Sequence, residues 1–307
     1  MTESHFSHLM KNKKQLIWVY PPNNWKSTSN KTFVYGWSDP KAKLFVSTEA
    51  GFKPAHTKIK IFPNGNFAQV VKLPKKENII RLVQVFGKKE TILKRKILVG
   101  ADLCVCPNVK QDRHTGLPLR HKNDMTVVID PGHGGKEHGT HSPKRIPEKV
   151  FNLQIAKLFV GAYCNTPLQG KIYLTRTTDK YVSLKDRVNF AKNKKCNILI
   201  SIHHNALPDG EDPLKHRGVG IYYTHDFVKP FAKKLLFSIS KSVGACRGMP
   251  LLKKYGIFKR NFALTRPDFC YAVLIECGFL THPIEAEVVT QRKIQEKIVR
   301  GIAKATM

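Results

Sequence analysis

Three apolar runs in this chain end at a side chain that can bind a metal ion or carry a proton. The runs and the residues that follow them are Val127–Ile129 with Asp130 and His133, Ile198–Ile202 with His203, and Ala272–Ile275 with Glu276. A buried ionisable group is costly without a partner, so packing alone gives an apolar strand no reason to end in this way. Because ligands of open α/β sheets bind at the carboxyl ends of the strands, the pattern predicts that these side chains meet in one site.

The sequence from Met125 onward alternates between strand and helix patterns. Strands are expected over 125–129, 171–175, 198–202, 218–223 and 271–276, and helices over 150–162, 184–192, 228–243 and 284–304. Alternation of this kind indicates an α/β domain with a largely parallel sheet flanked by helices.

The first hundred residues have the pattern of a small all-β domain. Runs rich in Val, Ile, Phe and Thr recur at short intervals and are separated by Pro, Gly and Asn. They span 16–20, 32–37, 42–47, 58–62, 67–73, 79–86 and 91–98. This spacing predicts a small antiparallel sandwich, and its turn placement resembles that of bacterial immunoglobulin-like modules. We expect the module over residues 1–103, a basic linker over 104–124 and the α/β domain over 125–307.

The chain is strongly basic, since 53 Lys and Arg residues against 22 Asp and Glu residues give a net charge of +31. Such a charge favours a polyanionic partner, for which nucleic acid, anionic lipid and phosphate-rich wall polymers are the candidate classes. The basic residues are spread along both halves and form no dense arm, so a solvated basic surface is the alternative. A hydrophobic content of 41% argues against a disordered chain.

Neither the apolar segments nor the cysteines identify the compartment. No stretch is long enough to span a bilayer, and the run 16–20 is too short for the hydrophobic part of a signal peptide. We therefore expect a trimmed mature form or export by another route. The seven cysteines have no spacing typical of disulfides, and Cys104 and Cys106 lack the second pair that a zinc knuckle needs. Structural free thiols are expected.

Four side chains have the make-up of a catalytic zinc site. His133, Glu148 and His203 would supply three ligands, and Glu276 a carboxylate that takes a proton from bound water. Glu148 has an ordinary alternative role, because it follows Pro147 at a helix start, where a negative charge suits the helix dipole.

Neighbouring side chains leave other ligand sets open. His204 follows His203, but successive strand residues point to opposite faces, so we expect only one of them to bind a metal and prefer His203. His138 and His141 lie in the loop after His133 and are further candidates. Asp130 is expected to accept a hydrogen bond from a ligand imidazole or from the backbone.

Six ordered motifs occur between residues 125 and 307. They are VVIDPGHGG at 127–135, Glu148-Lys149, Leu174-Thr175-Arg176 followed by Asp179, Leu184 with Arg187, SIHHN at 201–205 and LIECGFLTH at 274–282. Together they resemble the zinc-dependent N-acetylmuramoyl-L-alanine amidases of the Amidase_3 family. The resemblance implies a phosphorylase/hydrolase-like fold, Zn²⁺ bound by His133, Glu148 and His203, and Glu276 as the catalytic acid–base residue.

Two positions depart from the family pattern. The first loop has Ser-Pro-Lys-Arg at 142–145, where relatives are richer in glycine, and His282 stands where Asn is usual. Both departures are expected to alter the rim of the cleft. The interval 206–217 is short, so we do not expect the blocking regulatory helix that some relatives insert there.

Three further polar residues belong to these motifs. We expect Arg176 and Arg187 to be mainly structural and to pair with Asp179 or with helix-end carbonyls; contact with a substrate carboxylate is the alternative. Asn205, which ends the SIHHN motif, is a candidate residue of the cleft.

The resemblance predicts an envelope enzyme that cleaves the amide between the lactyl group of N-acetylmuramic acid and L-alanine in peptidoglycan. We expect a monomer without a nucleic-acid partner, and a β module that helps to hold it on anionic wall polymers. The alternatives are a zinc peptidase acting on stem peptides and a basic wall-polymer or nucleic-acid binding protein on an inactive amidase scaffold. Tyr255, Phe258 and Phe262 lie among basic residues, as nucleic-acid binding would require, but we interpret them as a cleft rim.

Overall fold

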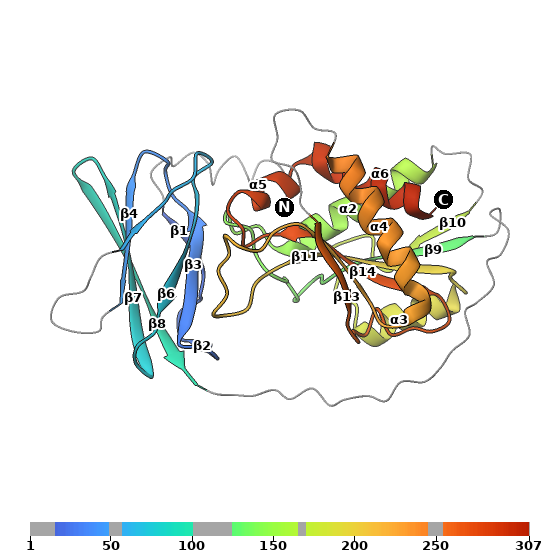
Figure 1. Cartoon of the computed structure of the whole chain (residues 1–307), viewed down its shortest axis with the longest axis horizontal. Coiled ribbons are helices and arrows are strands. Elements are labelled where there is room, and N and C mark those ends of the chain that lie inside the picture. Colours follow the sequence, from blue (N-terminus) through green and yellow to red (C-terminus); the bar gives the residue numbers. More distant parts are fainter. Residues whose placement is uncertain (1–15, 49–56, 101–124, 165–169, 245–253, 307) are drawn as a thin grey trace.

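The computed structural model of this chain describes residues 16–48, 57–100, 125–164, 170–244 and 254–306. It contains an all-β part, built from strands between residues 17 and 99, beside an α/β part that begins at residue 126 (Figure 1). Both fold classes predicted from the sequence are confirmed. The expected linker, with Cys104 and Cys106, lies outside the described residues, so the division of the chain at 103 and 124 stays a prediction.

A six-stranded sheet forms the centre of the α/β part. In spatial order its strands are β10 (Lys171–Leu174), β9 (Thr126–Pro131), β11 (Ile198–Asn205), β14 (Tyr271–Phe279), β12 (Val219–Tyr223) and β13 (Lys254–Lys259). The first four are parallel, β12 is antiparallel to β14, and β13 is parallel to β12. The carboxyl ends of β9, β11 and β14 therefore lie side by side at one edge of the sheet, as the pattern predicts.

Helices cover both faces of this sheet. One face carries α2 (Glu148–Cys164), α4 (Lys229–Val243) and α6 (Arg292–Thr306), and the other carries α3 (Leu184–Asn193); a short 3₁₀ helix, η2 (Asp226–Val228), precedes α4 (Figure 1). The strand β9 shows how the sequence divides the two cores. Val127 and Ile129 pack in the core that contains α2, α4 and α6, whereas Val128 packs with α3. All three side chains are buried, as a parallel strand covered on both faces requires.

Three features of the α/β part differ from the sequence prediction. The helix expected over 284–304 is two helices, α5 (Glu285–Val289) and α6. Thr290 lies at the break, where its hydroxyl donates to the Ala286 carbonyl at 2.7 Å and competes with helical hydrogen bonding. Strand β13 is unpredicted because lysines flank it and Gly256 interrupts it, features that suit the edge strand it forms. Strands β11 and β14 each continue three residues beyond their predicted ends, so His203 and Glu276 lie inside strands.

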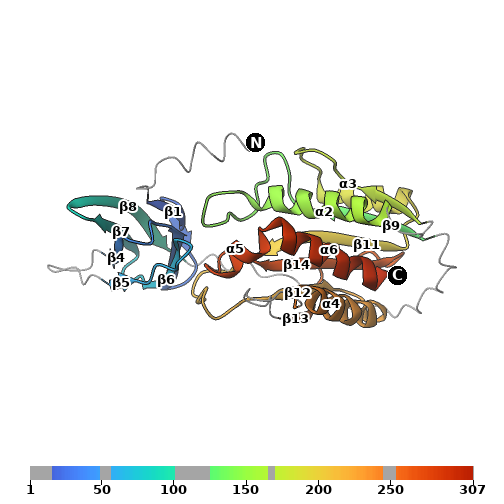
Figure 2. The same ribbon diagram turned by 90° about the horizontal axis from the view of Figure 1, so that it is seen from above.

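The all-β part is a sandwich of two sheets (Figure 2). One contains β1 (Ile17–Tyr20), β3 (Lys31–Trp37) and β6 (Asn66–Lys72), and the other β2 (Trp25–Ser27), β8 (Lys89–Val99), β7 (Glu77–Phe86), β4 (Lys43–Thr48) and β5 (Thr57–Ile59). Trp18, Phe67 and Leu82 are buried between the sheets. Pairing is antiparallel except between β2 and β8, where the expectation of an antiparallel sandwich is wrong because the unpredicted strand β2 joins the sheet edge in parallel.

Among the described residues, no helix combines the length and the apolar character needed to span a membrane. Cys196, Cys270 and Cys277 are buried thiols in the α/β part. Burial and the nearby carboxylates raise the pKa of Cys277 well above its usual range, so this thiol stays protonated at neutral pH.

Two helical glycines provide a matched test of how closely α4 and α6 pack. A Cβ atom at Gly301 of α6 would lie 2.5 Å from Cα of Ile239 in α4, whereas a Cβ at Gly161 of α2 would meet nothing within 4 Å. We expect Gly301→Ala to lower the free energy of unfolding by about 1–3 kcal/mol through overpacking. Gly161→Ala should raise it by about 0.5–1 kcal/mol, because alanine favours a helix interior. Urea unfolding measures both changes in the free energy of unfolding. Equal changes in the two variants would contradict the close contact between α4 and α6.

Candidate metal centre

Three side chains meet at the carboxyl edge of the sheet. His133 follows β9, Glu148 is the first residue of α2, and His203 lies in β11. Each offers one ligand atom, and these atoms all lie within 4.8 Å of one another. His133 Nε2 lies 3.3 Å from Glu148 Oε2, and His203 Nδ1 lies 3.1 Å from Glu148 Oε1. The carboxylate is 4% exposed and the imidazoles 28% and 18%, so the cluster opens to solvent on the imidazole side.

The backbone beside the cluster has no room for larger residues. A Cβ atom at Gly132 would lie 2.2 Å from the His203 ring, and one at Gly139 would lie 2.4 Å from Glu148 Oε2. His133 itself has a φ of 59°, a left-handed conformation that costs energy for a residue with a side chain. The loop therefore needs support from outside to keep His133 in place.

Glu148 is held as a carboxylate by its neighbours. Its Oε1 accepts from the His204 N–H at 3.0 Å and from Asn152 Nδ2 at 3.1 Å, and its Oε2 accepts from the Thr140 N–H at 3.1 Å. Burial alone would raise the pKa of Glu148, but the hydrogen bonds and charges of the two imidazoles outweigh burial and hold it well below its usual range. Asn152 is absent from the sequence prediction, although its position four residues after Glu148 places both on one face of α2.

Glu276 lies beside the cluster on β14. Its register partner is His203 on β11 on one side and Gly220 on β12 on the other. Within the described part of the chain, Glu276 Oε2 is buried without a hydrogen-bond partner. Burial and the nearby charge of Glu148 raise the pKa of Glu276 well above its usual range. A buried carboxyl oxygen without a partner is costly, so this atom points to a group that completes the site.

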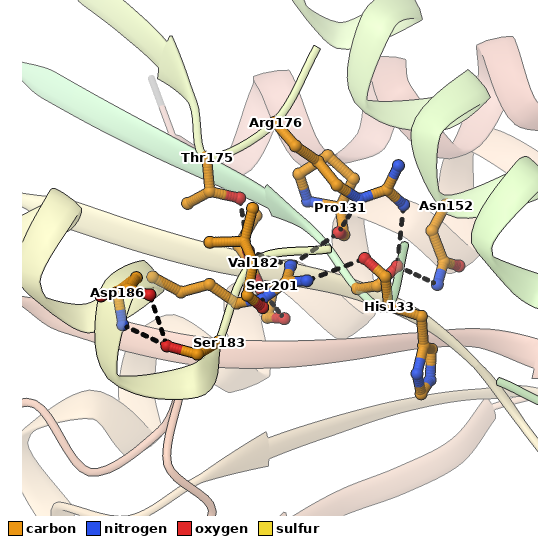
Figure 3. Close-up of polar contacts among 12 residues, drawn as sticks. Pro131, His133, Asn152, Thr175, Arg176, Val182, Ser183, Asp186 and Ser201 are labelled. Atoms are coloured by element: carbon orange, nitrogen blue, oxygen red, sulfur yellow. Dashed lines mark hydrogen bonds and ion pairs between the residues drawn. The ribbon is translucent and has the colours of Figure 1, made fainter. Parts of the chain in front are cut away.

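Two buried arginines hold the backbone of the loop that carries His133 (Figure 3). Arg176 donates to the carbonyls of Pro131 at 2.8 Å and Gly132 at 2.9 Å. Arg187 donates to the carbonyls of Pro131 at 2.8 Å and His133 at 2.7 Å. Charged donors make stronger hydrogen bonds than neutral ones, so these contacts offset the strained backbone of His133.

Asp130 belongs to the same network but not in the predicted way. Its Oδ1 accepts from Arg187 at 2.7 Å and from the Thr175 hydroxyl at 2.5 Å, and its Oδ2 accepts from the Ser201 hydroxyl at 2.7 Å. The expectation that it contacts a ligand imidazole or backbone is therefore wrong. Asp130 therefore acts on the His133 loop indirectly. It holds Arg187, whose guanidinium group donates hydrogen bonds to carbonyls of that loop.

Asp179, one of the two kinds of partner expected for Arg176 and Arg187, makes its hydrogen bonds elsewhere. It accepts from Lys149 Nζ at 2.8 Å and from the Gly135 N–H at 2.8 Å, and it forms no hydrogen bond with Arg176 or Arg187. The carboxylate lies outside the buried network because it is half exposed, at 54%. It ties the glycine loop to the first turn of α2 instead.

The other candidate histidines lie outside the three-residue cluster. His204 points to the opposite face of β11, where its Nδ1 lies 2.8 Å from Asn152 Oδ1 and its ring packs on Phe151. Burial lowers the pKa of His204 to about 4, which keeps the ring neutral. His138 and His141 contact each other, with ring centroids 5.9 Å apart.

Aromatic side chains line the other side of Glu276. Tyr222 of β12 forms a hydrogen bond with Asn205, and burial together with the Glu276 charge raises its pKa to about 12. Phe258 stacks on Tyr222 with ring centroids 5.1 Å apart, and the Tyr255 and Phe258 rings are 4.9 Å apart. The sequence identified the aromatics of 255–262 but not Tyr222, which looks like an ordinary alternating strand residue.

His282 is not at a cleft rim, contrary to the expectation. Its side chain is buried, and its Nδ1 accepts from the backbone N–H groups of Ile284 and Glu285, each at 3.2 Å. These are free donors at the start of α5, where a side chain commonly satisfies them. An Asn at this position would offer an amide oxygen for the same purpose.

Comparisons with known proteins agree with this geometry. A profile of the family described as Amidase_3, N-acetylmuramoyl-L-alanine amidase, matches residues 127–306. A probable cell wall amidase, LytH of Staphylococcus saprophyticus, is 31% identical over 202 residues, which cover 64% of this chain and 62% of that protein. The chain thus matches less than two thirds of the length of this curated relative.

Two solved structures resemble the α/β part. An N-acetylmuramoyl-L-alanine amidase from Clostridium difficile 630 is 35% identical with a TM-score of 0.54, and the match covers 60% of this chain and 95% of that one. The catalytic domain of CwlV, an N-acetylmuramoyl-L-alanine amidase from Bacillus (Paenibacillus) polymyxa var. colistinus, is 31% identical with a TM-score of 0.53, covering 59% and 95%.

The buried arginine network can be tested against an exposed ion pair. Arg187→Met leaves Asp130 as a buried charge without its partner, so we expect the free energy of unfolding to fall by about 3–5 kcal/mol. The control is Arg292→Met, which removes a solvent-exposed pair with Glu296 and should cost only about 0.3–0.5 kcal/mol. If urea unfolding gave similar losses of free energy for the two variants, Arg187 would not stabilise the fold through the buried network.

Proposed function

Because this chain belongs to the Amidase_3 family of N-acetylmuramoyl-L-alanine amidases, whose profile matches more than half of it, we propose that it hydrolyses peptidoglycan at the amide between the lactyl group of N-acetylmuramic acid and L-alanine. The observation that carries this proposal is the meeting of His133, Glu148 and His203 beside a separate carboxyl group, Glu276. Residues from four separate segments of the chain converge there, and packing alone gives no reason to bring such groups together.

We further propose that the cluster binds Zn²⁺. Two imidazoles and one carboxylate are a typical ligand set of catalytic zinc sites, which keep a further position for water. Three features of the structure fit this ion: the ligand atoms lie close together, the carboxylate is ionised, and the glycines at 132 and 139 leave space for the rings and the carboxylate. When bound, Zn²⁺ would supply Lewis acidity and bring the pKa of a water ligand to about 7.

We propose that Glu276 moves the proton in this reaction. It lies one strand from His203, at the same register, and Gly220 is its register partner on the other side. Glu276 would take a proton from the attacking water and return it to the nitrogen of the departing L-alanine. The cleaved C–N bond then leaves a lactyl carboxylate on the glycan and a free amine on the stem peptide.

The charge and the relatives support action in the cell envelope. Peptidoglycan and its attached polymers carry carboxylates and phosphates, which a net charge of +31 would attract. The similar LytH protein is described as a probable cell wall amidase. We therefore propose peptidoglycan as the partner.

Digestion of purified sacculi, analysed by mass spectrometry, tests the proposal directly. We expect intact stem peptides to be released from the glycan; shortened stem peptides would instead identify a peptidase. Glu276→Gln should lower the rate by about 10²–10⁴-fold, the range typical of a lost acid–base group, with zinc content unchanged. Glu296→Gln, at an exposed glutamate, is the control and should be fully active. An active Glu276→Gln protein would refute the assigned role.

Gly132 provides a test of the metal site that does not depend on activity. A Cβ atom there would overlap the His203 ring, so Gly132→Ala should displace a ligand and weaken Zn²⁺ affinity. By analogy with the loss of groups that orient ligands, we expect a change of at least about 10–100-fold. Chelator competition measures this affinity, with Gly161→Ala as control. Unchanged affinity in Gly132→Ala would argue against His203 as a ligand.

A further inference from the structure

The sheet β1-β3-β6 of the sandwich contacts the loops at the metal centre. Figures 1 and 2 show the sandwich against the end of the α/β part where α5 lies. Three loops take part in the contact: 132–147 after β9, 206–218 after β11 and 280–284 after β14. These are the loops that follow the strands associated with His133, His203 and Glu276.

Asp209 is the main anchor of the second loop. Its Oδ1 accepts from the Tyr20 hydroxyl at 2.6 Å and the Thr32 hydroxyl at 2.9 Å, and its Oδ2 accepts from Trp25 Nε1 at 2.8 Å. Two of these donors belong to β1 and β3, and the third, Trp25, belongs to β2 at the edge of the other sheet. All three converge on one carboxylate of the α/β part. Hydrogen bonds to a charged group are the strong kind, so this contact fixes the loop more firmly than neutral pairs would.

Tyr35 links the sandwich to a ligand residue. Its hydroxyl donates to the His141 carbonyl at 2.9 Å, and it also contacts the Thr140 side chain. The backbone of Thr140 in turn donates to Glu148 Oε2 at 3.1 Å, and its carbonyl accepts from the Glu148 N–H at 2.8 Å. Tyr35 is 2% exposed, so water is kept from this chain of contacts. Only one residue separates the sandwich from the Glu148 carboxylate.

The remaining contacts complete the attachment of the loops. Asn64 and Asn66 both donate to the Pro283 carbonyl in the third loop, at 3.1 Å and 2.7 Å. Arg145 in the first loop donates to the Trp18 carbonyl at 2.9 Å. Leu207 in the second loop packs in the small apolar cluster around Phe33 and Tyr35.

We propose, on the basis of the function above, that the sheet β1-β3-β6 is a working part of the metal centre. It holds the three loops in the arrangement that hydrolysis requires, with Asp209 and Tyr35 as its principal positioning residues. The aromatic face of this sheet is therefore occupied within the molecule. The sandwich then contributes to hydrolysis itself, in addition to any contact with the wall.

The experiment compares Asp209→Ala and Tyr35→Phe with Asp226→Asn in the full chain. Asp226 is the matched control because its ion pair with Lys259 is solvent-exposed and lies after β12, which runs antiparallel to β14 and so ends at the other edge of the sheet. Three quantities are measured: hydrogen–deuterium exchange of the loops, Zn²⁺ affinity by chelator competition, and kcat and KM on a soluble disaccharide-peptide.

We expect faster exchange over 206–212 in Asp209→Ala and over 137–142 in Tyr35→Phe. Both variants should lose about 10–100-fold in kcat with little change in KM, and Tyr35→Phe should bind Zn²⁺ about 10-fold more weakly, as found when groups behind metal ligands are removed. Asp226→Asn should match the wild type in all three measurements.

Several results would overturn the proposal. Unchanged hydrogen–deuterium exchange would mean that the sandwich does not hold the loops. Faster exchange with unchanged kcat and Zn²⁺ affinity would mean that catalysis and metal binding do not depend on holding the loops in place. A variant that binds intact sacculi poorly but keeps its kcat on the soluble substrate would assign the sheet to wall attachment. If the wild type cleaved no amide, the proposed function would fail, while exchange and Zn²⁺ affinity would still decide whether the sheet holds the loops.

Discussion

The arrangement of the candidate metal centre depends on a buried charge network behind it. Arg176 and Arg187 fix the carbonyls of residues 131–133, and Asp130 supplies the negative charge that Arg187 needs in a buried position. A buried charge without a partner is strongly destabilising, so removing one member of this network alone should weaken the fold. The network makes the left-handed backbone at His133 tolerable and so sets the direction of its imidazole.

The sheet then brings the other groups to His133. Parallel pairing of β9, β11 and β14 places Pro131 opposite Ile202 and His203 opposite Glu276. Helix α2 begins at Glu148 close to the same edge, and this carboxylate joins both imidazoles. Strand order and register thus set the positions of His203 and Glu276, whereas His133 and Glu148 depend on the loop after β9 and on the start of α2.

The position of the sandwich limits which of its surfaces could contact the cell wall. The side chains of Tyr20, Phe33 and Tyr35 are used against the α/β part, so they are not a free aromatic surface. The hypothesis that the sandwich contacts anionic polymers therefore concerns its other sheet. There, β8 has exposed lysines at 89 and 94, which would suit a phosphate-bearing polymer.

The sequence predicted the side chains of the candidate site better than the residues that hold those side chains in place. His203 and Glu276 could be singled out because each directly follows an apolar run, and His133 because it lies in the glycine loop after one. The period-two alternation of a strand separated His203 from His204. The partners of Asp130 could not, because they come from α3, from β11 and from the residue after β10, and their meeting depends on the tertiary fold. The role of Asp209 was equally out of reach: it lies in a loop without periodicity, and its donors are 177 to 189 residues away. The break at Thr290 was missed because a single hydroxyl does not disturb the helical pattern of its neighbours.

The most direct test of this account is the position of bound zinc. Crystals of the full chain grown with Zn²⁺ and measured at the zinc absorption edge would locate the ion by its anomalous signal. The account predicts a single strong peak at about 2.0–2.2 Å from a nitrogen of His133, a nitrogen of His203 and an oxygen of Glu148, with Glu276 next to the ion but not bound to it. A peak on other residues, or no peak at this edge of the sheet, would contradict it.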